Sequence, residues 1–140
     1  MTTPPVPPPV RALKLLIADD RPRTRRALRA LLAAHPGFEV VGEASDGEEA
    51  LACVEALRPD LVLLDVWMPR LDGIAAVAAI KARWPAIRVV VHSLAIERYD
   101  DALAAGADAF VAKGGRPDEL LRALGTSSPA PETRGPSRKG

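Results

Sequence analysis

The sequence predicts an α/β fold in which five parallel strands form a doubly wound sheet with helices on both faces. Short, continuously apolar runs alternate five times with segments whose apolar residues recur at helical spacing. Strands that are apolar throughout are typical of parallel sheets covered on both faces. The runs begin about 21 to 27 residues apart, and 140 residues are too few for an eightfold barrel, so an open sheet is expected.

Each expected strand is followed by one expected helix. The strands span residues 13–18, 38–44, 60–65, 87–93 and 108–113. The helices span residues 22–34, 46–57, 72–84, 97–106 and 116–124. In the first helix, four apolar residues share one face: Ala27, Leu28, Leu31 and Leu32.

Residues typical of helix ends support the other four helices in order. Asp46 and Asp72 are the expected N-caps of the second and third helices. Pro85 ends the third helix, and Gly106 ends the fourth. Pro117 stands at the first position of the fifth helix, where a proline is favoured.

Composition separates a folded region from two biased ends. Residues 1–12 form a proline-rich leader and residues 125–140 a Pro/Ser/Gly tail, and both are expected to be disordered. Residues 13–124 form the single folded domain, and their 17 acidic and 15 basic side chains give no basis for direct nucleic-acid binding. One cysteine, Cys53, cannot make an internal disulfide, and no run reaches the ~20 apolar residues of a membrane span. We therefore expect a cytoplasmic protein without membrane contact.

Polar residues stand at the ends of four of the five strands. Asp19 and Asp20 end the first strand, Asp65 the third, Ser93 the fourth and Lys113 the fifth. With the flavodoxin-like strand order 2-1-3-4-5, the first and third strands are neighbours, so the three carboxylates meet where ligands bind in such sheets. The alternative is that these side chains only cap loops and helices.

The chemistry of this set indicates a metal and a phosphoryl group. Carboxylates about 4 Å apart repel by roughly 4 kcal/mol per pair at an effective dielectric of 20, so a cation is expected between them. Oxygen ligands beside an opening suit Mg²⁺. A lysine and a hydroxyl on the other side are suited to stabilising a phosphoryl group on one of the acids.

Four segments carry a resemblance to a known family. They are "LIADD", "LVLLDVWMPRLDG", "VVVHS" and "GADAFVAK". Across residues 13–124 the chain resembles the receiver (response-regulator) domain of two-component signalling, of the kind that usually precedes a LuxR-like helix-turn-helix. The resemblance implies that Asp65 is the phospho-acceptor and that Mg²⁺ binds Asp19, Asp20, Asp65 and the backbone carbonyl of Trp67.

The same resemblance implies a switch and its partners. Ser93 and Lys113 would contact the phosphoryl group, and Ser93 and Phe110 would form the switch. The donor would be a sensor histidine kinase or a histidine phosphotransfer protein. The face made by the fourth helix, fifth strand and fifth helix would bind a second copy or an output protein. The chain would be a signalling phospho-acceptor and not an enzyme in the usual sense, with no DNA-binding output domain.

Two positions depart from the family pattern. Gly114 and Gly115 follow Lys113 where many receivers have a proline, so that loop is expected to be permissive. Phe110 lacks a hydroxyl, so any switching there works through packing alone.

Three other classes of protein are alternatives. A haloacid-dehalogenase phosphatase expects a second aspartate where Trp67 stands. A flavodoxin expects a phosphate loop after the first strand, where "ADDRPRT" would repel phosphate. A receiver that acts as an interaction module without phosphorylation stays open, although the complete residue set argues against it.

Two further features have alternative interpretations. A cluster of arginines opens the first helix: Arg21, Arg23, Arg25, Arg26 and Arg29. It is either a solvated basic face or a docking surface for the phosphodonor. The bulk of Trp67, two residues after the acceptor, is expected to hinder the attacking water and prolong an aspartyl phosphate.

Overall fold

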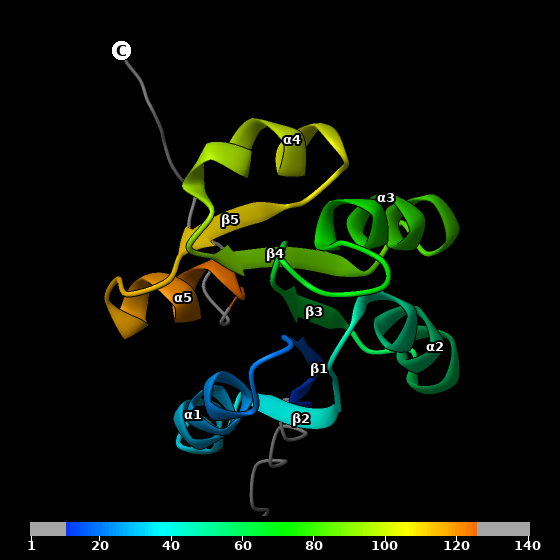
Figure 1. Ribbon diagram of the computed structural model, residues 1–140. Coiled ribbons are helices and arrows are strands. Elements are labelled where there is room, and N and C mark those ends of the chain that lie inside the picture. The colour runs from blue at the N-terminus through cyan, green and yellow to red at the C-terminus, as the bar shows by residue number, and fades with distance from the viewer. Residues whose placement is uncertain (1–10, 126–140) are drawn as a thin grey trace, which may run out of the picture.

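The sheet of the computed structural model, which describes residues 11–125, has the predicted strand order. The strands are β1 (Leu13–Ala18), β2 (Phe38–Ala44), β3 (Leu61–Leu64), β4 (Arg88–Ser93) and β5 (Ala109–Ala112). All neighbouring strands are parallel, in the order β2-β1-β3-β4-β5 (Figure 1). The predicted α/β class, the parallel pairing and the order are confirmed. Most of the leader and nearly all of the tail lie outside the described residues, so their disorder stays a prediction.

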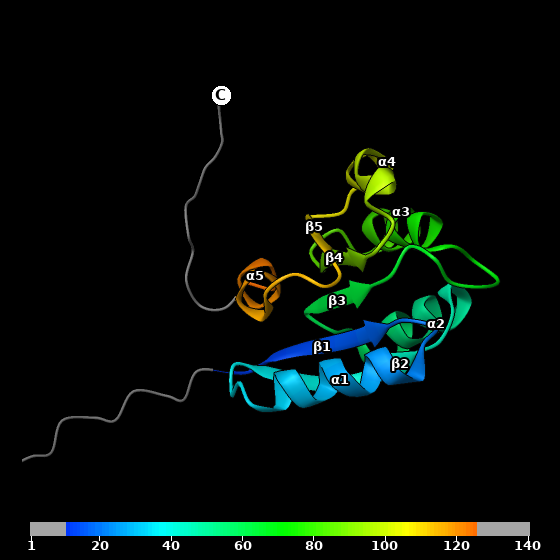
Figure 2. The ribbon, with the colours of Figure 1, turned by 60° about the vertical axis from the view of Figure 1, so that its left-hand side comes forward.

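Five helices cover the sheet in two layers. They are α1 (Pro22–Ala33), α2 (Gly47–Leu57), α3 (Gly73–Arg83), α4 (Tyr99–Ala104) and α5 (Pro117–Ala123). The first and last lie on one face, and the other three lie on the opposite face (Figures 1 and 2). Within residues 11–125, none of the helices combines the length and apolar character that a membrane span requires.

The alternation of side chains along each strand divides the core between these layers. Leu61 and Leu63 of β3 pack with α1 and α5, whereas Val62 and Leu64 pack with α2, α3 and α4. All four side chains are at most 2% exposed. Burying each one stabilises the fold by about 1.5–3 kcal/mol. The strand that carries Asp65 is therefore held rigidly from both sides.

The helix ends follow the sequence signals, with one difference. Asp46 accepts a hydrogen bond from the Glu49 backbone N–H at 2.7 Å, and Asp72 accepts one from that of Ala75 at 3.0 Å. Gly106 takes the left-handed φ of +112° just after α4. However, α4 is shorter than the predicted 97–106, because residues Ile96–Arg98 form a 3₁₀ turn. The side chain of Ile96 is exposed, so no buried contact draws this turn into α geometry.

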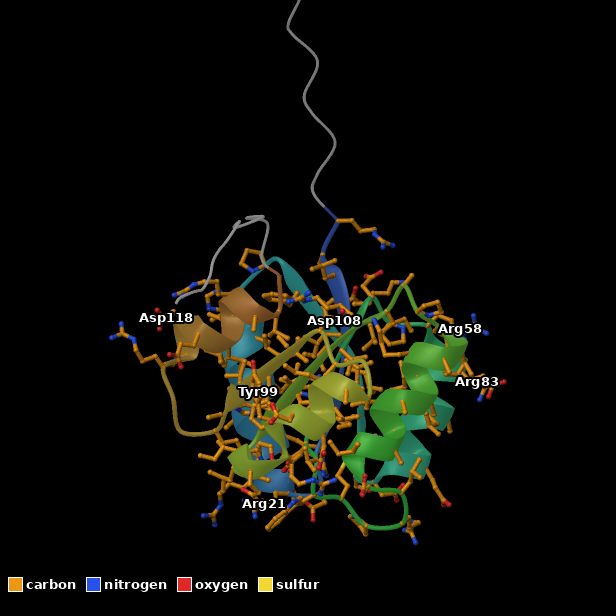
Figure 3. All side chains as sticks on the ribbon, turned by 90° about the horizontal axis from the view of Figure 1, so that it is seen from above. Arg21, Arg58, Arg83, Tyr99, Asp108 and Asp118 are labelled. Carbon is orange, nitrogen blue, oxygen red and sulfur yellow. The ribbon has the colours of Figure 1, made fainter. Side chains whose placement is uncertain are left out.

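Within residues 11–125, the amino-terminal edges of the strands carry no comparable cluster of acids. Figure 3 shows Arg58 and Arg83 there, at the far ends of α2 and α3. Their guanidinium groups lie 5.4 and 4.3 Å from the ring centroid of Trp84. Each of these two cation–π contacts stabilises the helix ends by about 0.5–1 kcal/mol, as is typical of exposed sites. The polar residues of the sequence analysis gather at the opposite edge.

Candidate functional site

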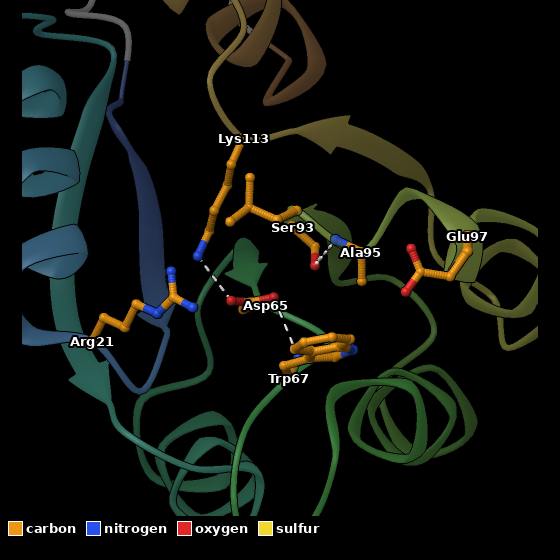
Figure 4. A pocket seen from close by; sticks show the side chains of 8 residues that line it. Arg21, Asp65, Trp67, Ser93, Ala95, Glu97 and Lys113 are labelled. Atoms are coloured by element: carbon orange, nitrogen blue, oxygen red, sulfur yellow. Dashed lines mark hydrogen bonds and ion pairs between the residues drawn. The ribbon is translucent and has the colours of Figure 1, made fainter.

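A pocket of about 140 Å³ opens at the carboxyl ends of β3, β4 and β5. Eight residues line it: Arg21, Asp65, Trp67, Ser93, Leu94, Ala95, Glu97 and Lys113 (Figure 4). Three of the residues predicted from strand ends, Asp65, Ser93 and Lys113, therefore share one cavity. This is the edge where ligands bind in doubly wound sheets.

The two remaining predicted acids stand directly beside this pocket. Asp19 follows β1 and is 2% exposed, Asp65 follows β3 and is 5% exposed, and Asp20 is exposed. One carboxylate oxygen from each of the three lies within 4.8 Å of the others. Strand pairing produces the convergence, since Ala18 and Leu64, the residues before Asp19 and Asp65, are partners in the register.

Lys113 ties two of the acids together. Its Nζ donates to Asp19 Oδ2 at 2.7 Å and to Asp65 Oδ2 at 2.8 Å. Its side chain is only 9% exposed, and those of its two partners are 3% and 6% exposed. A buried carboxylate is costly without a partner, so this one ammonium group holds two charges in place. The arrangement still carries an excess of negative charge.

The other oxygen of each buried acid accepts from the backbone. Asp19 Oδ1 accepts from the Arg21 N–H at 2.9 Å, and Asp65 Oδ1 accepts from the Trp67 N–H at 3.3 Å. Both acids are thereby oriented by the loops that follow their own strands. Asp65 Oδ2 faces Lys113 and the pocket, which leaves it within reach of a ligand there.

The carboxylates fit a small divalent cation. Their spacing, at most 4.8 Å, is close to the ~4.2 Å across an Mg²⁺ ion with ligands at ~2.1 Å. The donor set is all oxygen and lies beside an opening, as Mg²⁺ sites usually do. Asp19, Asp20 and Asp65 could therefore bind a metal ion. The Trp67 carbonyl as a fourth ligand stays a prediction.

Ser93 and Phe110 occupy different environments. Ser93 is 1% exposed, and its Oγ accepts a hydrogen bond from the Ala95 N–H at 3.0 Å, so its hydroxyl is directed along its own loop. Phe110 lies on β5 outside the pocket, half-buried, with its ring edge against Tyr99 at 5.4 Å between centroids. The structure therefore places the first at the site and the second behind it, next to α4.

The loop from β3 to α3 is fixed by close packing and an ion pair. The Gly73 N–H donates to the Val66 carbonyl at 2.7 Å, which folds the loop back over the end of β3. Arg70, at φ +70°, pairs with Asp46 through its Nε at 2.8 Å. The Glu49 N–H and then Arg70 hold the pKa of Asp46 below its usual value, so this carboxylate stays charged. Both contacts orient the segment that carries Trp67.

The arginine cluster divides into groups with different surroundings. Arg25 and Arg29 bind the two oxygens of Glu43 at 2.9 and 2.7 Å. The Arg29 hydrogen bond is the main reason that the pKa of Glu43 is lowered. Arg23 and Arg26 are exposed to solvent, and Arg21 lines the pocket. The cluster is therefore not uniform, because two members bind Glu43 and one lines the pocket, and its role as a solvated face or a docking surface stays a prediction.

His92 points away from the pocket. It lines a second cavity, of about 170 Å³, between α1 and α5. Its Nδ1 is buried without a hydrogen-bond partner among the described residues. Burial and then the charge of Lys113 lower the pKa of His92 to about 4, so the ring is neutral near pH 7.

Sequence reasoning missed three lining residues. Leu94, Ala95 and Glu97 follow β4 and form one wall of the pocket. The strand-end rule that found Ser93 could have found Leu94 and Ala95, because they are the next residues of the chain. Glu97 gave no such signal, since the 3₁₀ turn that brings it back to the pocket was not expected.

The sequence is similar to a described family and to several curated proteins. The family described as "Response regulator receiver domain" matches residues 15–125. Protein-glutamate methylesterase/protein-glutamine glutaminase 3 of Anaeromyxobacter dehalogenans is 47% identical over 104 residues, which cover 72% of this chain and 30% of that protein. The chain spans about half the length, or less, of the curated relatives it matches.

Solved structures agree with the fold. A two-component response regulator of the LuxR family from Aurantimonas sp. SI85-9A1 has a TM-score of 0.77 and 31% identity, covering 81% of this chain and 83% of that chain. The CheX-CheY-BeF3-Mg²⁺ complex from Borrelia burgdorferi has a TM-score of 0.74 and 29% identity, covering 81% and 87%. At these identities both likenesses extend beyond the general α/β architecture to the same kind of domain.

Proposed function

This chain belongs to the response regulator receiver domain family, and from that premise we propose that it is a phospho-acceptor whose Asp65 receives a phosphoryl group. The predicted resemblance to receivers of LuxR-family regulators is confirmed. One observation carries the proposal: the bridge from Lys113 Nζ to Asp19 and Asp65 beside an open pocket. A buried lysine at the pocket wall is a cation that can stabilise the charge of a phosphoryl group on Asp65.

Asp65 would act as the nucleophile. Its Oδ oxygen attacks the phosphorus of the donor, the bond to the leaving group breaks, and the electron pair leaves with that group. Lys113 then stabilises the charge of the transferred oxygens from its position at the pocket wall. Asp19, Asp20 and Asp65, with the Trp67 carbonyl, would hold Mg²⁺. When bound, Mg²⁺ supplies positive charge that offsets the phosphoryl oxygens.

Phosphorylation would change the position of Ser93. Its Oγ accepts from the Ala95 N–H, and its own proton is available to a phosphoryl oxygen on Asp65. A Ser93 hydroxyl that turned to donate there would release the loop before α4. Phe110 would then repack from its edge contact with Tyr99 toward the space left behind. The outcome is a two-state switch read out at α4, β5 and α5.

The proposed partners follow from this chemistry. The donor is a sensor histidine kinase or a histidine phosphotransfer protein, and the output is a second copy or another protein at the α4–β5–α5 face. The BeF3 and Mg²⁺ complex of CheY with CheX is one case in which such a domain is associated with a partner. The cytoplasm stays the predicted compartment.

Intact-mass measurement tests the function. The chain is incubated with Mg²⁺ and acetyl phosphate, and a single phosphoryl adduct is expected on the wild type but not on Asp65→Ala. The Asp100→Asn variant is the matched control, because it removes an exposed acid on α4, away from the pocket. Addition of a chelator should abolish the adduct. Equal adducts on wild type and Asp65→Ala, or none on either, would contradict the proposal.

A further inference from the structure

Arg21 is a cation of the pocket that the proposed function does not use. Its backbone N–H donates to Asp19 Oδ1 at 2.9 Å, which anchors the residue to one of the acids. Pro22 follows it as the first residue of α1 and favours the extended backbone that Arg21 adopts, with φ −101° and ψ 113°. Figure 4 shows its side chain reaching from the start of α1 toward Asp65 and Lys113.

The guanidinium group of Arg21 has no fixed partner within residues 11–125. It makes neither an ion pair nor a side-chain hydrogen bond there, whereas Arg25 and Arg29 are bound to Glu43. Lys113, the other cation of the pocket, already serves two carboxylates. In the proposed function Lys113 also faces the transferred phosphoryl group, so the donors left for a leaving group at the mouth are those of Arg21.

Part of the pocket wall suits a small acyl group, although Glu97 also lines the pocket. Its volume of about 140 Å³ is that of a few water molecules, at ~30 Å³ each. Trp67, Leu94 and Ala95 supply apolar surface on the wall. A planar guanidinium fork at the mouth matches the two oxygens of a carboxylate.

We propose that Arg21 binds the carboxylate leaving group of an acyl phosphate, so that this receiver is adapted to small acyl phosphates as donors. The inference rests on the proposed function and adds a residue that selects among its donors. Arg21 acts on the leaving group and not on the transferred phosphoryl group.

The leaving groups of two donors differ in charge. With an acyl phosphate, Asp65 Oδ bonds to phosphorus while the bond from phosphorus to the acyl oxygen breaks, and the electron pair leaves on a carboxylate anion. With phosphoramidate, the phosphorus–nitrogen bond breaks, and the already protonated nitrogen leaves as neutral ammonia. In-line attack directs either group away from Asp65, out through the mouth. A cation at the mouth therefore stabilises the departing carboxylate but not the departing ammonia.

The experiment compares these donors on matched variants. Rates of adduct formation are measured by intact mass with acetyl phosphate and with phosphoramidate, at saturating Mg²⁺. Arg21→Gln should slow the acetyl phosphate reaction about tenfold, as expected for one charge-assisted contact, and the phosphoramidate reaction less than twofold. Arg21→Lys should recover part of the loss. Arg23→Gln removes the same charge two residues away, outside the pocket, and should change neither small-donor rate.

Three outcomes would overturn the inference about Arg21, and a fourth would overturn the proposed function. An equal loss with both donors would mean that Arg21 contacts the phosphoryl group, which overturns the inference. No loss with either donor also overturns it. Magnesium binding is followed by tryptophan fluorescence, and a weaker Mg²⁺ affinity in Arg21→Gln that accounts for the rate would overturn it too. Absence of an adduct on the wild type with both donors would instead overturn the proposed function.

Discussion

At the scale of single residues, Trp67 combines a backbone contact to Asp65 with an exposed side chain at the pocket. Its backbone N–H orients Asp65 Oδ1, while its indole is 59% exposed and forms part of the pocket wall. Apolar surface of the exposed indole is in contact with water, which is unfavourable unless another group covers it. Its position beside Asp65 supports the hypothesis that it restricts the water that would hydrolyse an aspartyl phosphate.

Replacing Trp67 by Asn should therefore speed dephosphorylation. We expect the rate of loss of the adduct to rise several-fold to about tenfold, because a smaller polar side chain admits and orients water, and tenfold corresponds to about 1.4 kcal/mol of barrier. The adduct is followed by intact mass after the donor is removed. Trp84→Phe is the control, since Trp84 lies between Arg58 and Arg83, far from the pocket. An unchanged rate in Trp67→Asn would exclude shielding by the indole.

At the scale of elements, the junction of β3 with α3 is packed backbone against backbone. A Cβ added at Gly73 would overlap the backbone carbonyl of Asp65 and would lie 2.5 Å from the Val66 Cα. These are backbone atoms, so no side chain can rotate away. The start of α3 is therefore packed directly on the strand end that carries Asp65, and only glycine permits that approach.

The Gly73→Ala variant should be destabilised by about 2 kcal/mol or more, because overpacking against backbone forces α3 away from β3. Urea unfolding followed by circular dichroism measures the change. Gly37→Ala is the matched control, since nothing lies within 4 Å of a Cβ there, and its change should stay within about 0.5 kcal/mol. Similar losses in both variants would mean that the close approach is not the cause.

At the scale of the whole molecule, the fold places a neutral histidine in its interior. His92 lies on β4 among residues of α1, β5 and α5, and the charges acting on it are those of Lys113, Asp19 and Asp65. Burial lowers its pKa to about 4 from an ordinary value of 6.5. Below pH 6.5 the unfolded chain binds a proton on this histidine that the folded chain does not bind. The free energy of unfolding therefore decreases as the pH decreases.

Between pH 7 and pH 5 this effect should lower the free energy of unfolding by about 2 kcal/mol, in the absence of Mg²⁺. Urea unfolding at several pH values gives the slope, and His92→Phe should lose most of it because its ring does not titrate. His35→Gln removes the only other histidine of the chain and should keep the slope. A slope that His92→Phe retains would assign the effect to other groups.

The order of elements and the position of the site follow from patterns that are local in the sequence. Each apolar run and each cap, such as Asp46 and Asp72, acts through neighbours within a few residues. The position at strand ends then indicates Asp65, Ser93 and Lys113 as site residues, because parallel strands bring their carboxyl ends to one edge. By itself, the sequence thus determined the fold class and the edge at which the acids meet.

Only the tertiary structure decided which groups are paired and which are available. That Lys113 bridges Asp19 and Asp65, that Glu43 binds Arg25 and Arg29, and that Arg21 faces the pocket depend on distances between segments far apart in the chain. The sequence shows that these residues are all arginines, but it does not show toward which neighbours each guanidinium group points. Direction is set by packing across the sheet, which joins residues 48 to 94 positions apart at the acids and separates neighbours in the arginine cluster.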